Sequence, residues 1–351
     1  MKGTLIAIVA IATIASACAL VATADGTLDF YFIDVEGGQS TLIVTPSKQS
    51  LLVDTGYAGF GDRDANRIMA AARAAGVTQI DYLLTTHFHS DHDGGVAALA
   101  RQIPILTFVD HGDLERTAAA EAQPNWPKYL EDYDAYTAVR MKGRHLQPQP
   151  GDRLPLAGLT VTVLSSAAKT ITRPLAGAGK ANSACGPAAP PPADPLENPR
   201  STGFFLQFGA FRFIDLGDLT GVPLFALLCP NNLIGHVDLY LVPHHGGADA
   251  SYPATFAAVT PRVAIVNNGA TKGGSADVFV NLRRAPDLEG AWQLHTSKLV
   301  GVTNLRDDQT ANLDETTGYW IKASARDDGS FSVTNGRTQV STMFPRKPNR
   351  P

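Results

Sequence analysis

Several features are scarce in this chain of 351 residues, and each scarcity excludes a class of protein. Lysine and arginine number 29 against 33 acidic residues, so no excess of basic charge exists through which nucleic acid would bind in bulk. Nucleic acid binding through a local patch or a metal stays open. The 32 glycines follow no triplet period, which excludes collagen, and 44% hydrophobic residues exclude a disordered chain. The length allows one large domain or two modest ones.

The first 24 residues differ in character from the rest. Lys2 supplies a positive charge, and residues 5–20 form an apolar run without a charge. Ala22-Thr23-Ala24 then gives the small-x-small pattern that signal peptidase cleaves. We therefore predict a signal peptide at residues 1–24 and an exported mature chain, periplasmic or secreted, at residues 25–351. A retained membrane anchor is the alternative. After signal cleavage, no transmembrane domain is expected.

Cysteine is the other scarce residue, with three in the chain. Cys18 lies in the predicted signal, where it also raises the alternative of a lipoprotein. Cys185 and Cys229 remain in the mature chain. Two cysteines in an oxidising compartment can pair, but their distance in space does not follow from their spacing. A disulfide and two separate thiols both stay open here.

Apolar runs and turn residues predict the order of the elements. Strand-like runs alternate with two helical stretches, residues 64–75 and 96–103, which indicates a layered α/β fold. Residues 167–200 are rich in proline and predict a loop-rich insertion. Strands on both sides of this insertion indicate two similar halves. The predicted strands are residues 30–33, 41–44, 51–53, 80–85, 105–109, 203–206, 211–214, 237–242 and 263–266, with a final hairpin inside 318–338.

The most informative segment lies at residues 85–95. Its core is His87-Phe88-His89-Ser90-Asp91-His92, followed by Asp93-Gly94-Gly95. His87 and His89 are two residues apart at a strand end, so their rings project to the same side. Asp91 and His92 fall in the turn into the next helix and can face a second position. Three imidazoles and a carboxylate suit Zn²⁺ or a similar metal, and the alternative is a surface cluster without one.

This motif resembles the metallo-β-lactamase superfamily of metallohydrolases. Residues 32–40 and 52–56 are similar to the opening of the hydrolase domain in DNA-uptake competence channel proteins. Residues 216–219 and 242–247 are similar to its later metal motifs. The resemblance extends from about residue 28 to about residue 270. It implies a four-layer αββα sandwich, and it implies only the hydrolase part, because the transmembrane channel of the competence proteins is absent.

The resemblance also implies roles for single residues. His87 and His89 would hold one metal, Asp91 and His92 the other, and Asp218 would bridge them. His245 would complete the second position, whereas His244 would serve substrate or lie just outside the ligands. Asp54 is a candidate for fixing the tautomer of a ligating imidazole. The metal would be zinc, as one or two ions, with manganese or iron as alternatives.

The sequence departs from the superfamily pattern at one ligand. A further histidine is usual between the first motif and the bridging aspartate, but only His111 and His145 lie in that interval. Neither directly precedes the strand at residue 203, where residues 197–201 stand instead. A site with a single metal is therefore an open alternative. His111 either contributes to the site or is an ordinary surface residue. Gln39 stands where the competence-type domains carry an acidic residue.

A metal of this kind acidifies a bound water and stabilises the charge that develops on the attacked group. Asp91 or Asp218 would orient the nucleophile, and Arg200 or Lys272 would hold an anionic group. We therefore predict an exported metal-dependent hydrolase of a phosphodiester or related anionic ester, acting on a small molecule. One alternative is hydrolysis of a lactone or β-lactam at the same site. The other is a non-enzymatic periplasmic binding module with a degraded site.

Overall fold

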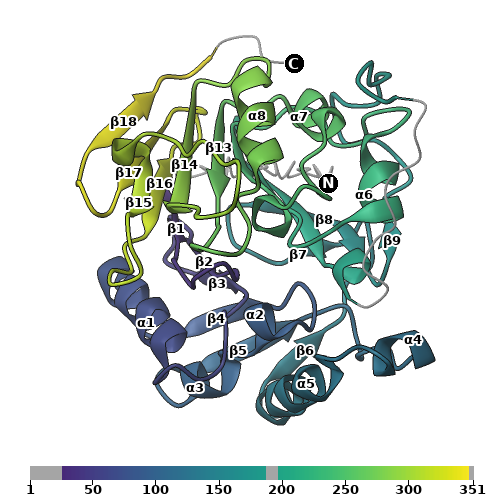
Figure 1. Cartoon of the computed structure of the whole chain (residues 1–351), viewed down its shortest axis with the longest axis vertical. Coiled ribbons are helices and arrows are strands. Elements are labelled where there is room, and N and C mark those ends of the chain that lie inside the picture. Colours follow the sequence, from purple (N-terminus) through teal and green to yellow (C-terminus); the bar gives the residue numbers. More distant parts are fainter. Residues whose placement is uncertain (1–25, 187–196, 348–351) are drawn as a thin grey trace, which may run out of the picture.

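The computed structural model describes residues 26–186 and 197–347. The predicted signal peptide at residues 1–24 lies outside these ranges. Two nine-stranded sheets pack face to face and helices cover their outer faces (Figure 1). The predicted four-layer αββα sandwich is confirmed.

The first sheet combines both ends of the described chain. Its order is β18-β17-β16-β1-β2-β3-β4-β5-β6, and β1 pairs with β2 on one side and β16 on the other. Pairing is antiparallel from β18 to β3 and parallel from β3 to β6. The strands are β1 (Leu28–Phe32), β2 (Thr41–Val44), β3 (Ser50–Val53), β4 (Ile80–Leu84), β5 (Ile105–Val109), β6 (Arg144–Leu146), β16 (Ile321–Ala325), β17 (Phe331–Asn335) and β18 (Ser341–Phe344).

The second sheet repeats this change from antiparallel to parallel pairing. Its order is β15-β14-β13-β12-β11-β10-β8-β7, with β9 on β8, and pairing is parallel from β11 to β15. The predicted hairpin of β10 and β11 is present. The strands are β7 (Arg153–Leu154), β8 (Thr160–Ser166), β9 (Lys169–Thr170), β10 (Gly203–Phe208), β11 (Phe211–Asp215), β12 (Leu239–Leu241), β13 (Val263–Val266), β14 (Gly290–His295) and β15 (Thr310–Asn312).

Helices form the two outer layers. On the first sheet these are α1 (Arg63–Ala75), α2 (Ser90–Asp93), α3 (Val96–Ala100) and α5 (Trp126–Arg140), with α4 (Ala118–Glu121) in the preceding connection. On the second sheet they are α6 (Gly221–Leu228), α7 (Pro253–Val259) and α8 (Ala276–Arg284). Short 3₁₀ turns occur at η1 (Asn198–Arg200), η2 (His244–Gly246) and η3 (Asp307–Gln309). None of the helices within the described ranges is long and apolar enough to span a bilayer.

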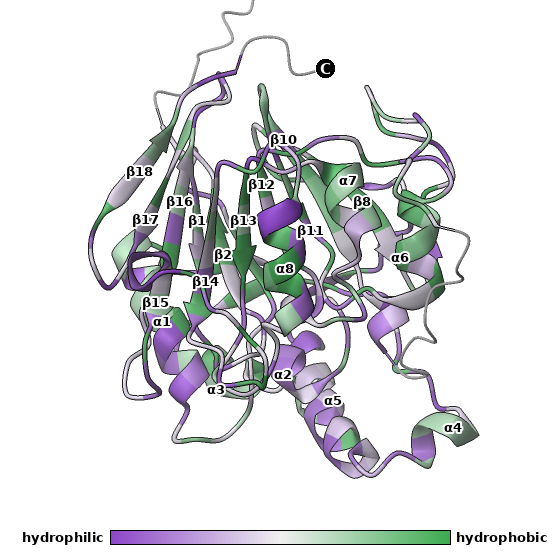
Figure 2. Ribbon diagram, turned by 45° about the horizontal axis from the view of Figure 1, so that its top comes forward, coloured by the Kyte–Doolittle hydropathy of each residue, from purple (hydrophilic) through white to green (hydrophobic). Residues whose placement is uncertain are grey.

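Alternation along the strands explains three separate layers of hydrophobic core. In β1, Leu28, Phe30 and Phe32 point between the sheets, whereas Tyr31 points toward the helices. The ring of Phe30 meets that of Phe213 in the opposite sheet at 4.7 Å. Because both faces of these strands are covered, many of them are continuous apolar runs. Figure 2 shows β12 and β13 as hydrophobic and α1 and α5 as more polar.

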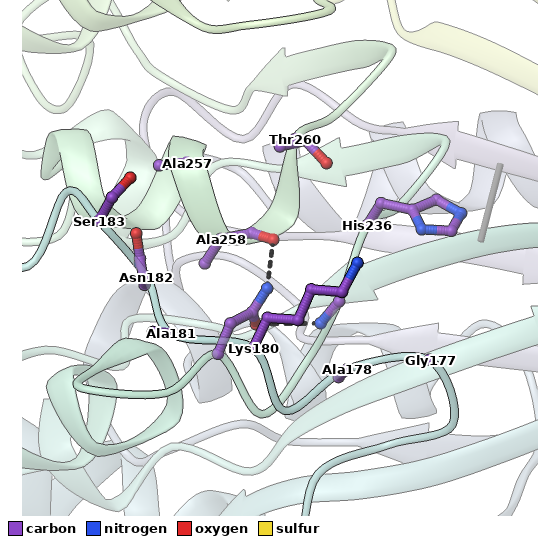
Figure 3. A pocket seen from close by; sticks show the side chains of 12 residues that line it. Gly177, Ala178, Lys180, Ala181, Asn182, Ser183, His236, Ala257, Ala258 and Thr260 are labelled. Atoms are coloured by element: carbon purple, nitrogen blue, oxygen red, sulfur yellow. Dashed lines mark hydrogen bonds between the residues drawn. The ribbon is translucent and has the colours of Figure 1, made fainter.

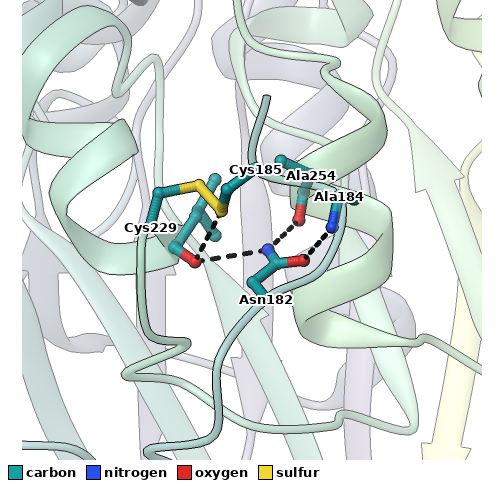
Figure 4. The surroundings of a disulfide bond; sticks show 6 residues. Asn182, Ala184, Cys185, Cys229 and Ala254 are labelled. Carbon is teal, nitrogen blue, oxygen red and sulfur yellow. Dashed lines mark hydrogen bonds between the residues drawn. A yellow bond between two sulfur atoms is a disulfide. The ribbon is translucent and has the colours of Figure 1, made fainter. Parts of the chain in front are cut away.

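Part of the loop-rich insertion at residues 167–200 is ordered against the second sheet. It contains β9, and Cys185 forms a disulfide with Cys229 across a Cα separation of 5.8 Å (Figure 4). Of the two alternatives for the cysteines, pairing is therefore the correct one. Asn182 donates hydrogen bonds of 3.2 and 2.9 Å to carbonyls of α6 and α7, so the segment is tied to the outer helices.

Candidate metal centre

Four ionisable side chains meet at one edge of the sandwich. Asp91 and His92 lie in α2, which follows β4, whereas Asp218 follows β11 and His245 lies in η2 after β12. Each segment leaves the carboxyl end of a strand in a parallel part of a sheet, the edge at which α/β proteins bind ligands. The two sheets contribute two residues each.

The donor atoms of these residues form a compact polyhedron. His92 Nε2 lies 3.1 Å from Asp91 Oδ2 and 3.1 Å from Asp218 Oδ2. His245 Nε2 lies 3.1 and 3.2 Å from the same two oxygens, and the two imidazole nitrogens are 3.3 Å apart. Donors bound at about 2.0–2.1 Å in a tetrahedron stand about 3.3 Å from one another. The spacing therefore fits one tetrahedral cation.

Burial makes a cation at this position physically reasonable. All four side chains are buried, and within the described ranges Asp218 Oδ1 and His245 Nδ1 have no hydrogen-bond partner. Two carboxylates in a buried site require positive charge, because an isolated buried carboxylate costs several kcal/mol or more. The donor set of two imidazoles and two carboxylates suits zinc and other first-row metals.

His87 and His89 stand beside this cluster as an incomplete second position. His87 Nε2 lies 3.0 Å from His89 Nδ1 and 3.9 Å from Asp218 Oδ2. Where a further histidine would precede β10, the chain instead has Glu197 and Asn198. The structure thus groups four of the six predicted ligands tightly and leaves two imidazoles with fewer donors around them.

His111 lies outside the cluster. Its Nε2 is 2.7 Å from Glu197 Oε2, and its ring packs on Phe88 at 4.7 Å. Only 1% of His111 is exposed, so the alternative of an ordinary surface residue is wrong. Glu197 also accepts a hydrogen bond of 3.3 Å from the backbone of Phe88, between the two histidines of the motif. His111 therefore contacts a carboxylate that in turn binds the backbone of the histidine motif.

Asp54 lies where a partner for the ligating imidazole is needed. Its Oδ2 is 2.7 Å from His92 Nδ1, so His92 Nε2 is left to face the cluster. Thr86 donates hydrogen bonds to Asp54 of 2.7 Å from its backbone and 2.8 Å from its hydroxyl. Burial raises the pKa of Asp54, although the contact with His92 opposes this.

His244 borders the cluster without joining the four donors. Its Nδ1 lies 2.7 Å from Asp249, and its Nε2 lies 3.7 Å from Asp218 Oδ2. His244 and His245 have φ angles of 52° and 55°, a left-handed conformation that is uncommon for these residues and that often occurs at functional sites. This backbone turns two adjacent histidines toward one centre, which an ordinary extended or helical backbone would not do.

The charges of the cluster balance one another. Burial would raise the pKa of Asp91, but the Lys272 ammonium and His92 hold it well below its usual range. Burial is likewise outweighed at Asp218 by His245 and His92, so that its pKa is low. Burial would lower the pKa of His92, but the surrounding carboxylates raise it well above its usual value. Metal binding therefore competes with a proton on His92.

Two features of the site escaped the sequence reasoning. Gln39 donates to both carboxylate oxygens of Asp215 at 3.1 and 2.9 Å, and burial raises the pKa of Asp215 to about 7. Gly38 packs on the backbone of Asp91 so closely that a Cβ would stand 2.4 Å from its carbonyl oxygen. The motif at residues 32–40 was visible, but its contact with α2 depends on the fold.

Another group of potential ligands is already neutralised. Asp34, Glu36 and His295 bring donor atoms within 4.8 Å of one another. However, Arg67 lies 3.0 Å from Asp34 and 3.1 Å from Glu36. A guanidinium at this position supplies the positive charge that a metal would otherwise bring, so we assign this group a structural role.

A cavity that is separate from the cluster has no comparable set of ionisable groups. It encloses about 300 Å³ beside α7, and Lys180, Asn182 and His236 are among its lining residues (Figure 3). It shares no residue with the four-donor cluster. The buried ionisable groups, rather than the size of a hollow, identify the candidate site.

Residues 33–174 match the family model described as "Metallo-beta-lactamase superfamily". This segment contains the histidine motif, and the chain around it forms the expected pair of helix-covered sheets. This segment is thus similar to the metallo-β-lactamase superfamily, and the fold of the described chain is a four-layer αββα sandwich. The finer resemblance to the competence proteins stays a prediction.

The proteins to which this chain is similar have different names. An atrochrysone carboxyl ACP thioesterase from Passalora fulva is 41% identical over 70 residues, which is 20% of this chain and 20% of that protein. The match thus spans about a fifth of the relative's length. The solved YhfI from Bacillus subtilis aligns over 77% of this chain and 96% of its own, with 11% identity and a TM-score of 0.46. CmlA, a diiron β-hydroxylase from Streptomyces venezuelae, aligns over 74% of this chain and 50% of its own, with 15% identity and a TM-score of 0.40.

Proposed function

We propose that this chain is a metal-dependent hydrolase of an anionic ester. The observation that carries the proposal is the buried set of two imidazoles and two carboxylates at tetrahedral spacing. Asp91 reaches both this set and an adjoining cavity, so a substrate in the cavity would have access to the metal. We expect zinc, as one firmly held ion, with manganese or iron as alternatives.

The residues around the cluster would have separate roles in the reaction. When bound, the metal acts as a Lewis acid and lowers the pKa of a water molecule. Asp54 would keep His92 in the tautomer that ligates, and Asp91 and Asp218 would orient the attacking nucleophile. His244, held by Asp249, faces the side of the cluster next to Asp218. Lys272 contacts Asp91 and offers a positive charge to the substrate.

The cavity favours a carboxylic ester or thioester within this class. Three aromatic side chains line it, Tyr57, Phe60 and Tyr129, and its cations are two lysines, Lys128 and Lys272. A phosphodiester of nucleic acid would call for a row of cations along its backbone. The thioesterase name of the partial relative supports the same choice. Phosphodiester hydrolysis, which the sequence alone favoured, becomes the competing outcome of the test.

We further propose that the protein is exported and acts on a small molecule in the periplasm or outside the cell. The sequence of residues 1–24 supports export, and the Cys185–Cys229 disulfide is consistent with an oxidising compartment.

A substrate panel tests the proposed reaction. The purified chain, loaded with zinc, is offered an aryl thioester, an aryl carboxylic ester, bis(4-nitrophenyl) phosphate, a lactone and a chromogenic cephalosporin. We expect the thioester or carboxylic ester to give the highest kcat/KM, and Asp218→Asn to lower it on the order of 10³-fold or more. Asp134→Asn, an exposed carboxylate on α5, should leave it unchanged.

Four results would overturn parts of this proposal. Turnover of the phosphodiester alone would reject the acyl substrate, and turnover of the lactone or cephalosporin alone would favour those substrates. Turnover that survives both chelation and the Asp218 substitution would reject the metal mechanism. Ligand binding without turnover of any substrate would favour the binding module.

A further inference from the structure

The cavity beside the metal cluster is built from four separate segments. It encloses about 410 Å³, a size within the range of small-molecule sites. The lining comes from the segment after β3, the start of α2, the first turn of α5 and the loop after β13. The residues that matter for its chemistry are Tyr57, Phe60, Asp91, Lys128, Tyr129 and Lys272.

Aromatic rings form two sides of this cavity. Tyr57 and Phe60 meet edge to face with ring centres 6.3 Å apart. Across from them, Tyr129 stacks on His89 with ring centres 4.6 Å apart and an interplanar angle of 27°. The aromatic lining therefore extends from the rim to the imidazoles of the metal motif. Planar ligands gain specific ring contacts in such a space, which a puckered ring of similar size cannot match.

Phe60 is held at the rim although it is 71% exposed. Its φ is 51°, and Gly59, Gly61 and Asp62 on either side also have positive φ. A bulky residue in this conformation is uncommon and is retained where the local structure requires it. The guanidinium of Arg63 lies 4.6 Å above the ring and fixes it further. The backbone and Arg63 thus hold the exposed Phe60 ring at the mouth of the cavity.

Lys272 supplies the cation of the cavity. Its ammonium contacts the Asp91 carboxylate, lies 3.4 Å from the Tyr57 hydroxyl, and stands 5.6 Å from the centre of the Tyr57 ring. An ammonium has three donors, and these partners use two. The loop that carries Lys272 packs closely on the backbone of His245. A Cβ added to Gly273 would stand 2.3 Å from the carbonyl oxygen of His245, so a larger residue at this position would displace the loop.

The second lysine is balanced within its own helix. Lys128 lies 2.8 Å from Asp132 and 3.4 Å from Glu131. Its charge is therefore compensated by two carboxylates on α5, whereas Lys272 shares a single carboxylate with the metal cluster. Lys272 is the cation best placed to receive an anionic ligand.

We propose that this cavity binds the planar aromatic part of an anionic substrate, with Tyr57, Phe60 and Tyr129 contacting the ring and Lys272 pairing with the anionic group. The inference rests on the proposed function, whose substrate class it narrows to esters or thioesters that carry both a planar aromatic ring and an anionic group. Binding is measurable without turnover, so the two proposals can fail separately.

The test compares two acids that differ only in planarity. Calorimetric titration of the zinc-loaded chain uses 2-naphthoate and its saturated counterpart, decahydro-2-naphthoate. We expect 2-naphthoate to bind at least about fivefold more tightly. Phe60→Ala should remove most of this preference. Lys272→Met should weaken both acids about tenfold and keep the preference, and Lys272→Arg should restore binding.

Matched controls separate the cation from the metal. Lys142→Met removes an exposed lysine after α5 and should leave the dissociation constants of both acids unchanged. The neutral 2-naphthamide should bind wild type and Lys272→Met equally, and metal content should be the same in both. Equal affinity for the two acids would overturn the aromatic assignment, and unchanged affinity of Lys272→Met for both would overturn the ion pair. Loss of hydrolysis with an intact preference for 2-naphthoate would contradict only the proposed function.

Discussion

At the scale of residues, the site depends on buried charges that are satisfied only together. Asp54, His92 and Asp218 form a chain of contacts, with His92 Nδ1 on one carboxylate and His92 Nε2 3.1 Å from the other. Each buried carboxylate would be costly alone. Removing one member therefore changes the behaviour of the next, and the effects should appear first in metal affinity.

Replacing Asp54 by alanine should weaken metal binding by about 10- to 100-fold, because His92 loses the partner that fixes its tautomer. Competition with a chromophoric chelator measures this affinity. Asp134→Ala, on the exposed face of α5, is the control and should bind metal as wild type does. An unchanged affinity in Asp54→Ala would contradict the assigned role.

Asp215 predicts a pH dependence of stability. Burial raises its pKa in the folded chain from 3.8 to about 7, so between these values the folded state binds a proton that the unfolded state has lost. The contribution of Asp215 to the free energy of unfolding is therefore fully present below pH 3.8. It falls by on the order of 2–4 kcal/mol as the pH rises to 7. Thermal unfolding of wild type and Asp215→Asn at pH 5 and pH 8 tests this. Asp215→Asn should be more stable relative to wild type at pH 8 than at pH 5. A stability difference that is the same at both pH values would contradict this role of Asp215.

Sequence patterns identified single ligands but not their supporting contacts. His92, Asp218 and His245 lie in recognisable motifs. The pair of His111 and Glu197 could not be predicted, because 86 residues separate them and no motif marks either one. Their pairing depends on how the loop before β10 returns to β4.

At the scale of elements, the predicted strands are present, but the sequence did not predict β6 to β9, β14, β15, β18 or several helices. The predicted helix at residues 64–75 matches α1 because its small apolar residues recur with helical spacing. α5 was missed because its buried face contains Asp132, Tyr133 and Tyr136 rather than an aliphatic stripe. Tyr136 connects α5 to the histidine motif, because its ring packs near Phe88 and its hydroxyl donates a hydrogen bond to Asp110.

Arg262 joins the C-terminal strands to the second sheet. It is fully buried, lies 2.6 Å from Glu289, donates to the carbonyl of Pro345 at 2.9 Å and stands 5.0 Å from the ring of Phe331. Arg262→Ala should lower the free energy of unfolding by about 3–5 kcal/mol, because Asp238 and Glu289 lose the buried guanidinium that both contact. Denaturant unfolding measures this. Arg101→Ala, at an exposed ion pair, should cost less than about 1 kcal/mol. A loss as small in Arg262→Ala would show that the buried arginine does not anchor the hairpin.

At the scale of the whole molecule, the two sheets meet at the metal cluster. Asp91 and His92 come from the first sheet, and Asp218 and His245 from the second. A metal would therefore connect both halves and stabilise the folded chain by mass action. The sequence predicted the two halves and their motifs, but the closeness of the four donors follows only from the packing of the sheets.

Metal analysis of the purified chain tests the central claim most directly. After exhaustive dialysis, elemental analysis should find about one ion per chain, because one position has four donors at tetrahedral spacing. His245→Ala should retain almost none under the same conditions, whereas His145→Ala, outside the cluster, should retain as much as wild type. A wild-type chain without metal, or a His245→Ala variant with full content, would contradict the account.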